Sequence, residues 1–446
     1  MPKPNIIFFF SDQQRWDTLG CYGQKLPVTP NLDSYAKKGT RFENAFTCQP
    51  VCGPARACLQ TGLYASQNGC YRNGVALKPD APTIAKAFNE AGYQTAYIGK
   101  WHLASNVGRS NEKIGGRFNY SIKPVPKRLR GGYEDYWLAS DVLEFTSRGY
   151  KGHLFDSDMK KVPFKGYRAD AVTDFALDFI KGSERDKPFF LFISYIEPHH
   201  QNDRFRYEGP KGSKEKFKNY QAPGDLVGQK GDWKKSYPDY LGCCNSLDYN
   251  FGRIMQELEV SGLMENTIVF YASDHGSHFK TRNGEYKRSC HDASIRIPLL
   301  AFGPGFEGGK TVKNLVSLID LPPTFLRCAG VEPSWKMSGQ ALQDRMDSKE
   351  ENENEIFAQI SESEVGRLIR TKNWKYSITA KDKDGWLDAR GDVYFESHLY
   401  DLKNDPHELN NLVKSPEHEN IRAVLAEKIK VKMKEVGEGD IVILPT

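Results

Sequence analysis

A cysteine at the start of a helix-like stretch is the first candidate for chemistry in this sequence. Cys52 is followed by Pro54 and Arg56, and then by Thr61 and Gly62. Proline is tolerated in the first turn of a helix, so Cys52 is expected near a helix N-terminus, where the peptide dipoles favour an anion. Arg56 would then lie close enough to hold a charged or polar group. The alternative is a buried cysteine in a turn, which is the usual environment of a single cysteine.

Five clusters of polar residues each follow a short apolar run that is typical of a buried strand. They comprise residues 11–15, 99–102, 197–200, 273–276 and 287–298. Ligands bind at the carboxyl ends of the strands in an open α/β sheet, so we expect these clusters to share one site. A single aspartate there more often caps a helix, and a single histidine is more often an ordinary hydrogen-bonded residue. The five clusters together indicate an active site.

Two of these clusters carry side chains that can bind a metal ion. Asp12 and Gln13 follow the first apolar run, and Asp274 and His275 follow a later one. Carboxylate and amide oxygens suit Ca²⁺ or Mg²⁺, while the imidazole also admits Mn²⁺ or Zn²⁺. The sequence therefore predicts a divalent metal site at these four residues.

The elements that must position these clusters alternate along the larger, N-terminal part of the chain. Apolar runs predict strands at residues 6–10, 95–99, 189–194, 267–272 and 298–302, and residues 81–91, 169–181 and 241–261 are expected to be helices. Strands that are apolar on both faces and separated by helices are typical of a parallel sheet covered on two sides. Two long basic stretches, residues 105–132 and 201–238, interrupt this pattern. Their charge indicates either a solvated surface or a rim that faces a polyanion.

The C-terminal part has a different pattern. After a polar linker at residues 344–355, short alternating strands are expected at residues 356–360, 365–370 and 374–378, followed by an amphipathic helix at residues 415–436. This order is typical of an antiparallel meander that a helix covers. We therefore expect an α/β fold with a large, mostly parallel central sheet sandwiched by helices in residues 1–345, and a smaller C-terminal α+β domain in residues 346–446.

Composition narrows the function classes. The 446 residues, of which 39% are hydrophobic and 12% aromatic, are typical of an ordinary globular protein, and the net charge of +5 is compatible with an anionic substrate. No zinc-finger or RNA-binding signature accompanies this charge, so we expect no nucleic-acid partner. Nine cysteines without a regular spacing predict mostly reduced, buried thiols rather than a disulfide framework.

No apolar run approaches the roughly 18 residues of a membrane span, so no membrane partner is expected. Residues 6–10 follow a single lysine and lack a cleavage-site pattern, which favours a first strand over a signal peptide. The chain as it stands is therefore expected in the cytoplasm, and in the periplasm or outside the cell if a leader has been removed.

The stretch formed by Cys52, Pro54 and Arg56 resembles the C-x-P-x-R signature of the type I, formylglycine-dependent sulfatases of the alkaline phosphatase-like superfamily. Ala55 replaces the commoner serine at a variable position. Other segments are similar to further motifs of this family: residues 99–102 to G-K-W-H, 198–199 to P-H, 274–276 to D-[NH]-G, Lys287 with 294–298 to a lysine before S-[LI]-R-[VI]-P, and 399–408 to L-Y-D-L-x-x-D-P-x-E. The resemblance spans nearly the whole chain and is greatest to bacterial carbohydrate sulfatases.

The resemblance implies that a formylglycine-generating or anaerobic sulfatase-maturing enzyme oxidises Cys52 to formylglycine. It also implies a divalent metal, Ca²⁺ first, with Mg²⁺ or Mn²⁺ as alternatives. The metal residues would be Asp12, Gln13, Cys52, Asp274 and His275. Gln13 stands where the family commonly has an aspartate, which removes one negative charge but keeps a carbonyl ligand.

The activity implied is removal of sulfate from a sulfated saccharide. The catalytic residues would be Cys52, Arg56, Lys100, His102, His199 and Lys287. Arg56 and Lys100 would hold the hydrated formylglycine. Lys287 and His199 would bind the sulfate oxygens, and one of them would protonate the leaving oxygen. His102 would take a proton from the second hydroxyl, which expels sulfate and restores the aldehyde.

Several assignments stay open at this point. His200 and His291 are either surface residues or substrate contacts. Trp386, Asp388 and Arg390 form either a wall against a sugar or simple packing. A phosphonate monoester hydrolase or phosphodiesterase of the same superfamily is the alternative enzyme, and a non-catalytic protein that binds sulfated glycans is the alternative from another class.

Overall fold

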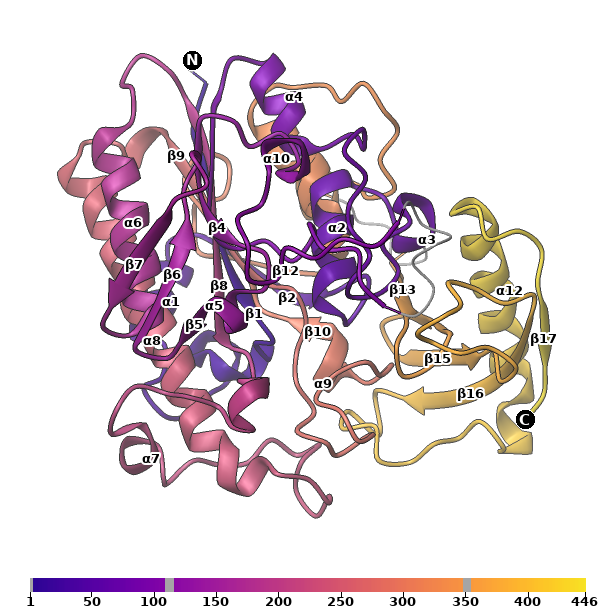
Figure 1. Ribbon diagram of the computed structural model, residues 1–446. Helices are drawn as coiled ribbons and strands as arrows, with labels where there is room; N and C mark the ends of the chain where they lie inside the picture. Colours follow the sequence, from indigo (N-terminus) through magenta and orange to yellow (C-terminus); the bar gives the residue numbers. More distant parts are fainter. Residues whose placement is uncertain (1–2, 109–115, 348–353) are drawn as a thin grey trace.

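Twelve strands form the larger of two sheets in the computed structural model, which describes residues 3–108, 116–347 and 354–446 (Figure 1). The five central strands are parallel and lie in the order β9 (Thr267–Ser273), β1 (Asn5–Asp12), β8 (Phe189–Pro198), β3 (Gln94–Lys100) and β4 (Tyr136–Ser140). Beyond β9 lie β11 (Leu299–Phe302), β2 (Thr40–Phe46), β10 (Arg296–Ile297) and β12 (Lys310–Ser317). Beyond β4 lie β6 (Lys151–Phe155), β5 (Ser147–Arg148) and β7 (Lys161–Lys165).

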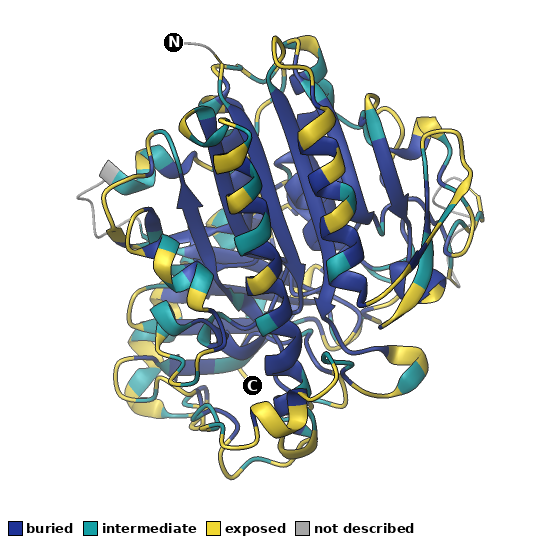
Figure 2. Ribbon diagram, turned by 90° about the vertical axis from the view of Figure 1, so that its left-hand side faces the viewer, coloured by how far each residue is buried: buried dark blue, intermediate teal, exposed yellow. Residues whose placement is uncertain are grey.

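Helices cover both faces of this sheet. On one face Ile7 and Phe9 of β1 pack with α1 (Pro30–Ala36), α6 (Arg168–Gly182) and α8 (Trp233–Val260). Figure 2 shows that the sheet behind these long helices is buried. On the other face Phe8 and Phe10 pack with α2 (Cys52–Thr61), α4 (Ile84–Glu90) and α10 (Leu321–Cys328). The shorter helices are α3 (Ala65–Asn68), α5 (Leu143–Thr146), α7 (Ser213–Lys216), α9 (Asp292–Ile295) and α11 (Leu342–Asp347).

The second sheet has five strands and comes from the C-terminal part of the described chain. Its strands lie in the order β13 (Ile356–Ile360), β14 (Gly366–Arg370), β15 (Trp374–Thr379), β16 (Val393–Asp401) and β17 (Val442–Leu444). The first four are antiparallel, and β17 is parallel to β16. Helix α12 (Glu419–Glu435) buries Leu425, Ile429 and Met433 beside this sheet (Figure 1). The predicted fold class is confirmed.

Several predicted boundaries are wrong. Helix α8 begins at Trp233 rather than 241, although Pro238 lies inside it, because Trp233, Tyr237 and Tyr240 pack into an aromatic core at this end. Helix α4 begins at residue 84 instead of 81, where the hydroxyl of Thr83 accepts a hydrogen bond from the backbone N–H of Lys86. Strand β11 is antiparallel to both β9 and β2, so the sheet is mixed beyond its parallel centre, although β12 pairs with β2 in parallel.

Other expectations lie partly outside the described residues. In the predicted linker, residues 344–347 belong to α11, and residues 348–353 are not described. In the first basic stretch, residues 109–115 are not described either. All nine cysteines are free thiols, seven of them buried, as predicted. None of the described helices is long and apolar enough to cross a bilayer.

Candidate active site

Cys52 is the first residue of α2, with Pro54 in the first helical turn, as the sequence predicts. Its side chain is 1% exposed, and it lies at the base of a cavity. The helix ends at Gly62, whose φ of +69° gives the left-handed conformation that commonly terminates helices. The cysteine therefore occupies a buried helix N-terminus that opens into a cavity, and the interpretation as a plain turn residue is wrong.

Strands β1 and β9 are parallel neighbours, which brings Asp12 and Asp274 together at their carboxyl ends. The backbone N–H of Gln13 donates to Oδ1 of Asp274 at 3.0 Å. Asp12, Asp274, His275 and Cys52 are all buried, and each offers one ligand atom within 4.8 Å of the other three. We call these four residues the Asp12 cluster.

Two cations lie against this cluster. The ammonium of Lys100 lies 2.6 Å from Oδ2 of Asp12, and Nη2 of Arg56 lies 2.9 Å from the same oxygen. Lys100 ends β3 directly after Gly99, which has a φ of +109°. A Cβ at Gly99 would lie 2.0 Å from the carbonyl oxygen of Ser194 on β8, so only glycine permits this approach of the two strands.

The electrostatics of the two carboxyls differ. Burial and the Cys52 sulfur raise the pKa of Asp12, but Lys100, His199 and Arg56 outweigh them, and its pKa lies well below the usual range. Burial and the negative charge of Asp12 raise the pKa of Asp274. Oδ2 of Asp274 has no hydrogen-bond partner, although Nη2 of Arg56 lies 3.5 Å from it. Two buried carboxyls, an imidazole and one unsatisfied oxygen fit a divalent cation, which would favour both charged forms.

Lys287, His199 and His102 approach Cys52 from the cavity side. Nζ of Lys287 lies 2.8 Å from Sγ of Cys52 and 3.2 Å from Nε2 of His199. Burial and then the charge of Lys287 lower the pKa of His199, so its ring is neutral and can accept a proton at Nε2. His102 lines the same cavity as Cys52. His102 has a φ of +62°, an uncommon backbone conformation of the kind found at functional sites.

The cavity above these groups has a volume of about 670 Å³. Phe145, Trp386 and Leu387 form exposed apolar parts of its wall. Its charged lining residues are Arg72, Lys100, Asp141, Glu144, Glu285, Lys287, Arg288 and Asp384. In the described chain, no lysine or arginine of residues 105–132 or 201–238 lines the cavity, so the predicted polyanion-facing rim does not form there.

Sequence reasoning missed several residues of this site. Asp141 and Glu144 line the cavity and follow β4, whose residues 137–139 are apolar. An apolar run followed by acidic residues is the same pattern that identified the other clusters, so the sequence could have revealed these two residues. Glu144 lies 3.7 Å from Nδ1 of His199. The amide nitrogen of Gln13 donates to the hydroxyls of Tyr207 and Ser277, which fixes the orientation of its side chain. No pattern in the sequence pointed to these two hydroxyls.

Three predicted substrate contacts do not line the cavity. His200 and His291 are buried, so the surface interpretation is wrong for both. The ring of His200 stacks on Tyr286, which does line the cavity. Arg390 is exposed and donates to the backbone carbonyl of Gly437. Of the predicted Trp386, Asp388 and Arg390, only Trp386 lines the cavity, together with its neighbours Asp384 and Leu387.

Comparisons with known proteins show the family of the chain and its fold. A family model described as Sulfatase matches residues 4–331, and one described as N-sulphoglucosamine sulphohydrolase, C-terminal, matches residues 284–435. The uncharacterized sulfatase YidJ of Escherichia coli (strain K12) is 30% identical, over 98% of this chain and 88% of its own length. The N-acetylglucosamine-6-O-sulfatase of Bacteroides thetaiotaomicron is 26% identical over the same shares.

A solved structure agrees in fold. It was determined in complex with its substrate, D-glucosamine-2-N,6-O-disulfate, and superposes with a TM-score of 0.79 at 24% identity. The match covers 98% of this chain and 99% of the other. Fold and sequence similarity therefore agree over almost the entire chain.

Proposed function

The chain belongs to the sulfatase family, and we propose that this sulfatase removes a sulfate group from a saccharide with Cys52, as formylglycine, at the reacting centre. The observation that carries the proposal is the convergence of Lys100, Lys287 and His199 on Cys52, beside the Asp12 cluster and below an open cavity. A sulfate ester is an anion, so its displacement needs positive charge around the sulfate and a proton for the leaving oxygen.

Asp12, Gln13, Asp274, His275 and the modified Cys52 would hold the divalent ion, for which Ca²⁺ is the first candidate because most of these ligands are oxygens. A bound divalent ion supplies positive charge and lowers the pKa of a hydroxyl that it binds. Arg56 and Lys100 neutralise Asp12 and would orient the modified side chain.

The remaining residues handle the sulfate and the protons. Lys287 faces Cys52 from the cavity and would bind the sulfate oxygens. Neutral His199 accepts a hydrogen bond from Lys287, so a proton can pass along this pair to the leaving oxygen. Glu144 lies near the opposite ring nitrogen of His199 and would keep the ring in place. His102 would take the proton from the second hydroxyl of the hydrated side chain.

The charges of the cavity indicate a saccharide that is sparsely charged beyond the reacting sulfate. Lys100 and Lys287 lie at the base, and the other two lining cations, Arg72 and Arg288, face four lining carboxylates. Arg288 is already paired with Glu285 and Glu362. The lining carboxylates thus equal the lining cations in number, so a second sulfate or a uronate would meet a wall without a net positive charge.

Trp386 offers a flat apolar surface to a sugar ring. Its side chain is 44% exposed at the cavity and lies 5.4 Å from the guanidinium of Arg288, measured to the ring centroid. Because Trp386 follows β15 of the second sheet, the C-terminal part of the chain contributes to the cavity. We further propose a catalytic domain of residues 1–345 and a C-terminal subdomain of residues 346–446.

The first test is release of sulfate from aryl sulfate by the protein matured with a formylglycine-generating or anaerobic sulfatase-maturing enzyme. A phosphodiester and a phosphonate monoester are assayed beside it. Cys52→Ala is expected to abolish turnover, while Cys328→Ser, at a half-buried thiol in α10, should retain it. Mass spectrometry of the Cys52 peptide reports the conversion. Unchanged turnover in Cys52→Ala contradicts the mechanism, and faster turnover of the phosphonate favours the alternative enzyme.

The second test compares saccharides. Monosulfated N-acetylglucosamine is the first substrate, because one relative is an N-acetylglucosamine-6-O-sulfatase. D-glucosamine-2-N,6-O-disulfate, the substrate of the protein with the similar fold, is the second. We expect a higher kcat/KM for the monosulfated sugar. A preference for the disulfated sugar contradicts the argument from cavity charge but leaves the sulfatase reaction intact.

A further inference from the structure

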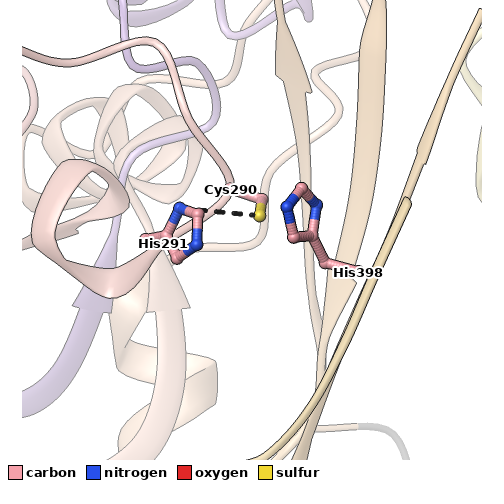
Figure 3. A group of neighbouring side chains, drawn as sticks. All are labelled: Cys290, His291 and His398. Carbon is pink, nitrogen blue, oxygen red and sulfur yellow. Dashed lines mark hydrogen bonds between the residues drawn. The ribbon is translucent and has the colours of Figure 1, made fainter. Parts of the chain in front are cut away.

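Cys290, His291 and His398 form a second group of metal-binding side chains, which we call the Cys290 cluster (Figure 3). Cys290 and His291 directly precede α9, whereas His398 lies on β16 of the second sheet. One ligand atom of each residue lies within 4.8 Å of the other two. Cys290 and His291 are buried and His398 is partly buried. The cluster therefore bridges the two sheets at a protected position.

The outward nitrogen of each histidine is held by a hydroxyl. Nε2 of His291 lies 2.9 Å from the hydroxyl of Tyr400. Nδ1 of His398 lies 3.0 Å and 2.9 Å from Oγ of Ser377 and Ser397. These hydrogen bonds leave the other nitrogen of each ring on the side of Cys290, as Figure 3 shows. Histidines that bind metals in proteins are fixed in this way by a second hydrogen bond.

The spacing is close to that of a tetrahedral zinc site. Nδ1 of His291 lies 3.9 Å from Sγ of Cys290, and the two histidine ring centroids are 5.4 Å apart. Zinc bonds of about 2.3 Å to sulfur and 2.0–2.1 Å to nitrogen place these two atoms about 3.6 Å apart at a tetrahedral angle. Oγ of Ser289, 3.2 Å from the same nitrogen, would be displaced and keep its bond to Ser294.

Nearby charges do not exclude a cation. Lys375 forms ion pairs with Asp292 and Glu408. Arg370 also faces Asp292, at 3.7 Å. Arg282 also acts electrostatically on both histidines, and its guanidinium donates to the backbone carbonyls of His407 and Glu408. The three cations of this region are accompanied by three carboxyl groups, those of Asp292, Glu364 and Glu408.

We propose that the Cys290 cluster binds one Zn²⁺, through Sγ of Cys290, Nδ1 of His291 and Nε2 of His398. A thiolate and two imidazoles suit Zn²⁺ and exclude Ca²⁺ and Mg²⁺, which prefer oxygen ligands, and water would fill the fourth position. Binding releases the thiol proton to solvent, since only the thiolate coordinates. Lys287 lies three residues before Cys290, so the ion ties the segment that carries this lysine to the second sheet. This site is separate from the Asp12 cluster and does not depend on the proposed substrate.

Cobalt is the probe for the first experiment, because a cobalt–thiolate bond gives an intense near-ultraviolet absorption band. The full chain carries Cys52→Ser in every sample, which removes the other thiol that lies in a metal-binding group. We expect a band that saturates at one Co²⁺ per chain and is displaced by Zn²⁺. Cys290→Ser and His398→Gln should lose the band, whereas Cys328→Ser should keep it.

The second experiment tests the hydroxyl of Tyr400, which supports His291. Tyr400→Phe leaves all three ligands in place but removes the hydrogen bond to His291, so the affinity for Co²⁺ should fall by about 10–100-fold. Circular dichroism verifies that each variant is folded. A band that survives in Cys290→Ser, or no band in the parent chain, overturns the proposal.

The third experiment measures the thermal stability of the chain and needs no cobalt. Zn²⁺ should raise the melting temperature of the chelator-treated parent, and this shift should vanish in His398→Gln. An equal shift in both proteins shows binding elsewhere and overturns the assignment. This experiment measures stability and not sulfate release, so its outcome does not depend on the outcome of the saccharide assay.

Discussion

The ammonium nitrogen of Lys287 lies 2.8 Å from Sγ of Cys52, although 235 residues separate them in the sequence. Lys287 also lies 3.2 Å from Nε2 of His199. One lysine therefore contacts both the side chain proposed to react and the imidazole proposed to pass the proton. Its position makes it the most informative residue for substitution.

Lys287→Ala is expected to lower kcat by about 10²–10³-fold on an aryl sulfate, because a positive donor at the developing charge is lost. The charge of Lys287 also lowers the pKa of His199, so that pKa should rise in the variant. Steady-state kinetics and NMR titration of the histidine measure the two effects. Lys313→Ala, an exposed lysine of β12, is the matched control and should change neither.

Asp274→Asn should have opposite effects on the metal-free and metal-bound protein. Removal of one of two buried like charges should raise the free energy of unfolding of the metal-free protein by about 1 kcal/mol. The same change removes an anionic ligand, so Ca²⁺ should stabilise the variant less than the parent. In the parent we expect this stabilisation to be about 2.7 kcal/mol when the calcium concentration is one hundred times the Kd.

Urea titrations with calcium and with chelator measure both values for Asp274→Asn. Asp158→Asn alters an exposed aspartate and is the control. Equal calcium stabilisation in the parent and Asp274→Asn would argue against Asp274 as a ligand.

His278 should make the protein less stable in mild acid. Its ring is fully buried, Nε2–H donates to the backbone carbonyl of Lys287 at 2.9 Å, and burial lowers its pKa from 6.5 to about 4. Below pH 6.5 the unfolded chain binds a proton that the folded chain does not bind until about pH 4. The free energy of unfolding should therefore fall by about 3 kcal/mol as the pH decreases through this window.

His278→Gln keeps an N–H donor near Lys287 but removes this titration. Urea titrations at several pH values between 4 and 7 should show a smaller loss of stability in the variant. His407→Gln, at an exposed histidine, should retain the slope of the parent. An identical slope in His278→Gln would show that the other buried histidines dominate.

Trp386→Ala should weaken binding of a saccharide substrate and leave the chemical step intact. Loss of the exposed indole is expected to raise KM by about tenfold with little change in kcat, because the sugar contacts it equally before and during reaction. Initial rates over a range of substrate concentrations separate the two constants. Tyr249→Ala removes an exposed aromatic ring of α8 outside the cavity and should change neither.

The sequence predicted the residues at strand ends well, because the end of a buried strand is marked by neighbouring residues alone: an apolar run followed by a polar cluster. Asp12 and Asp274 follow such runs, and the structure places them side by side. Their adjacency depends on the strand order, which no local pattern contains. Helix α8 shows the reverse case, since Pro238 lowered the local helix propensity but tertiary packing of Tyr237 and Tyr240 overrode it.

Interior histidines were harder to interpret from the sequence. His291 follows Lys287 by four residues, which favoured a shared role in substrate binding, yet its ring turns toward Tyr400 and Cys290. His398 carries no sequence signal of its own, because its neighbours come from β15 and from the segment before α9. Contacts between distant segments of this kind cannot be inferred from spacing along one chain.

The alternation of side chains along β1 has a consequence for the carboxylate at its end. Phe8 and Phe10 face one layer of helices, and Ile7 and Phe9 face the other. A slip of one residue would exchange these sets and carry Asp12 about 3.3 Å along the strand, further than the 2.6 Å between its oxygen and Lys100. Affinity for the proposed metal ion should therefore depend on strand alignment, and a calcium titration would detect core substitutions that distort the sheet far from the Asp12 cluster.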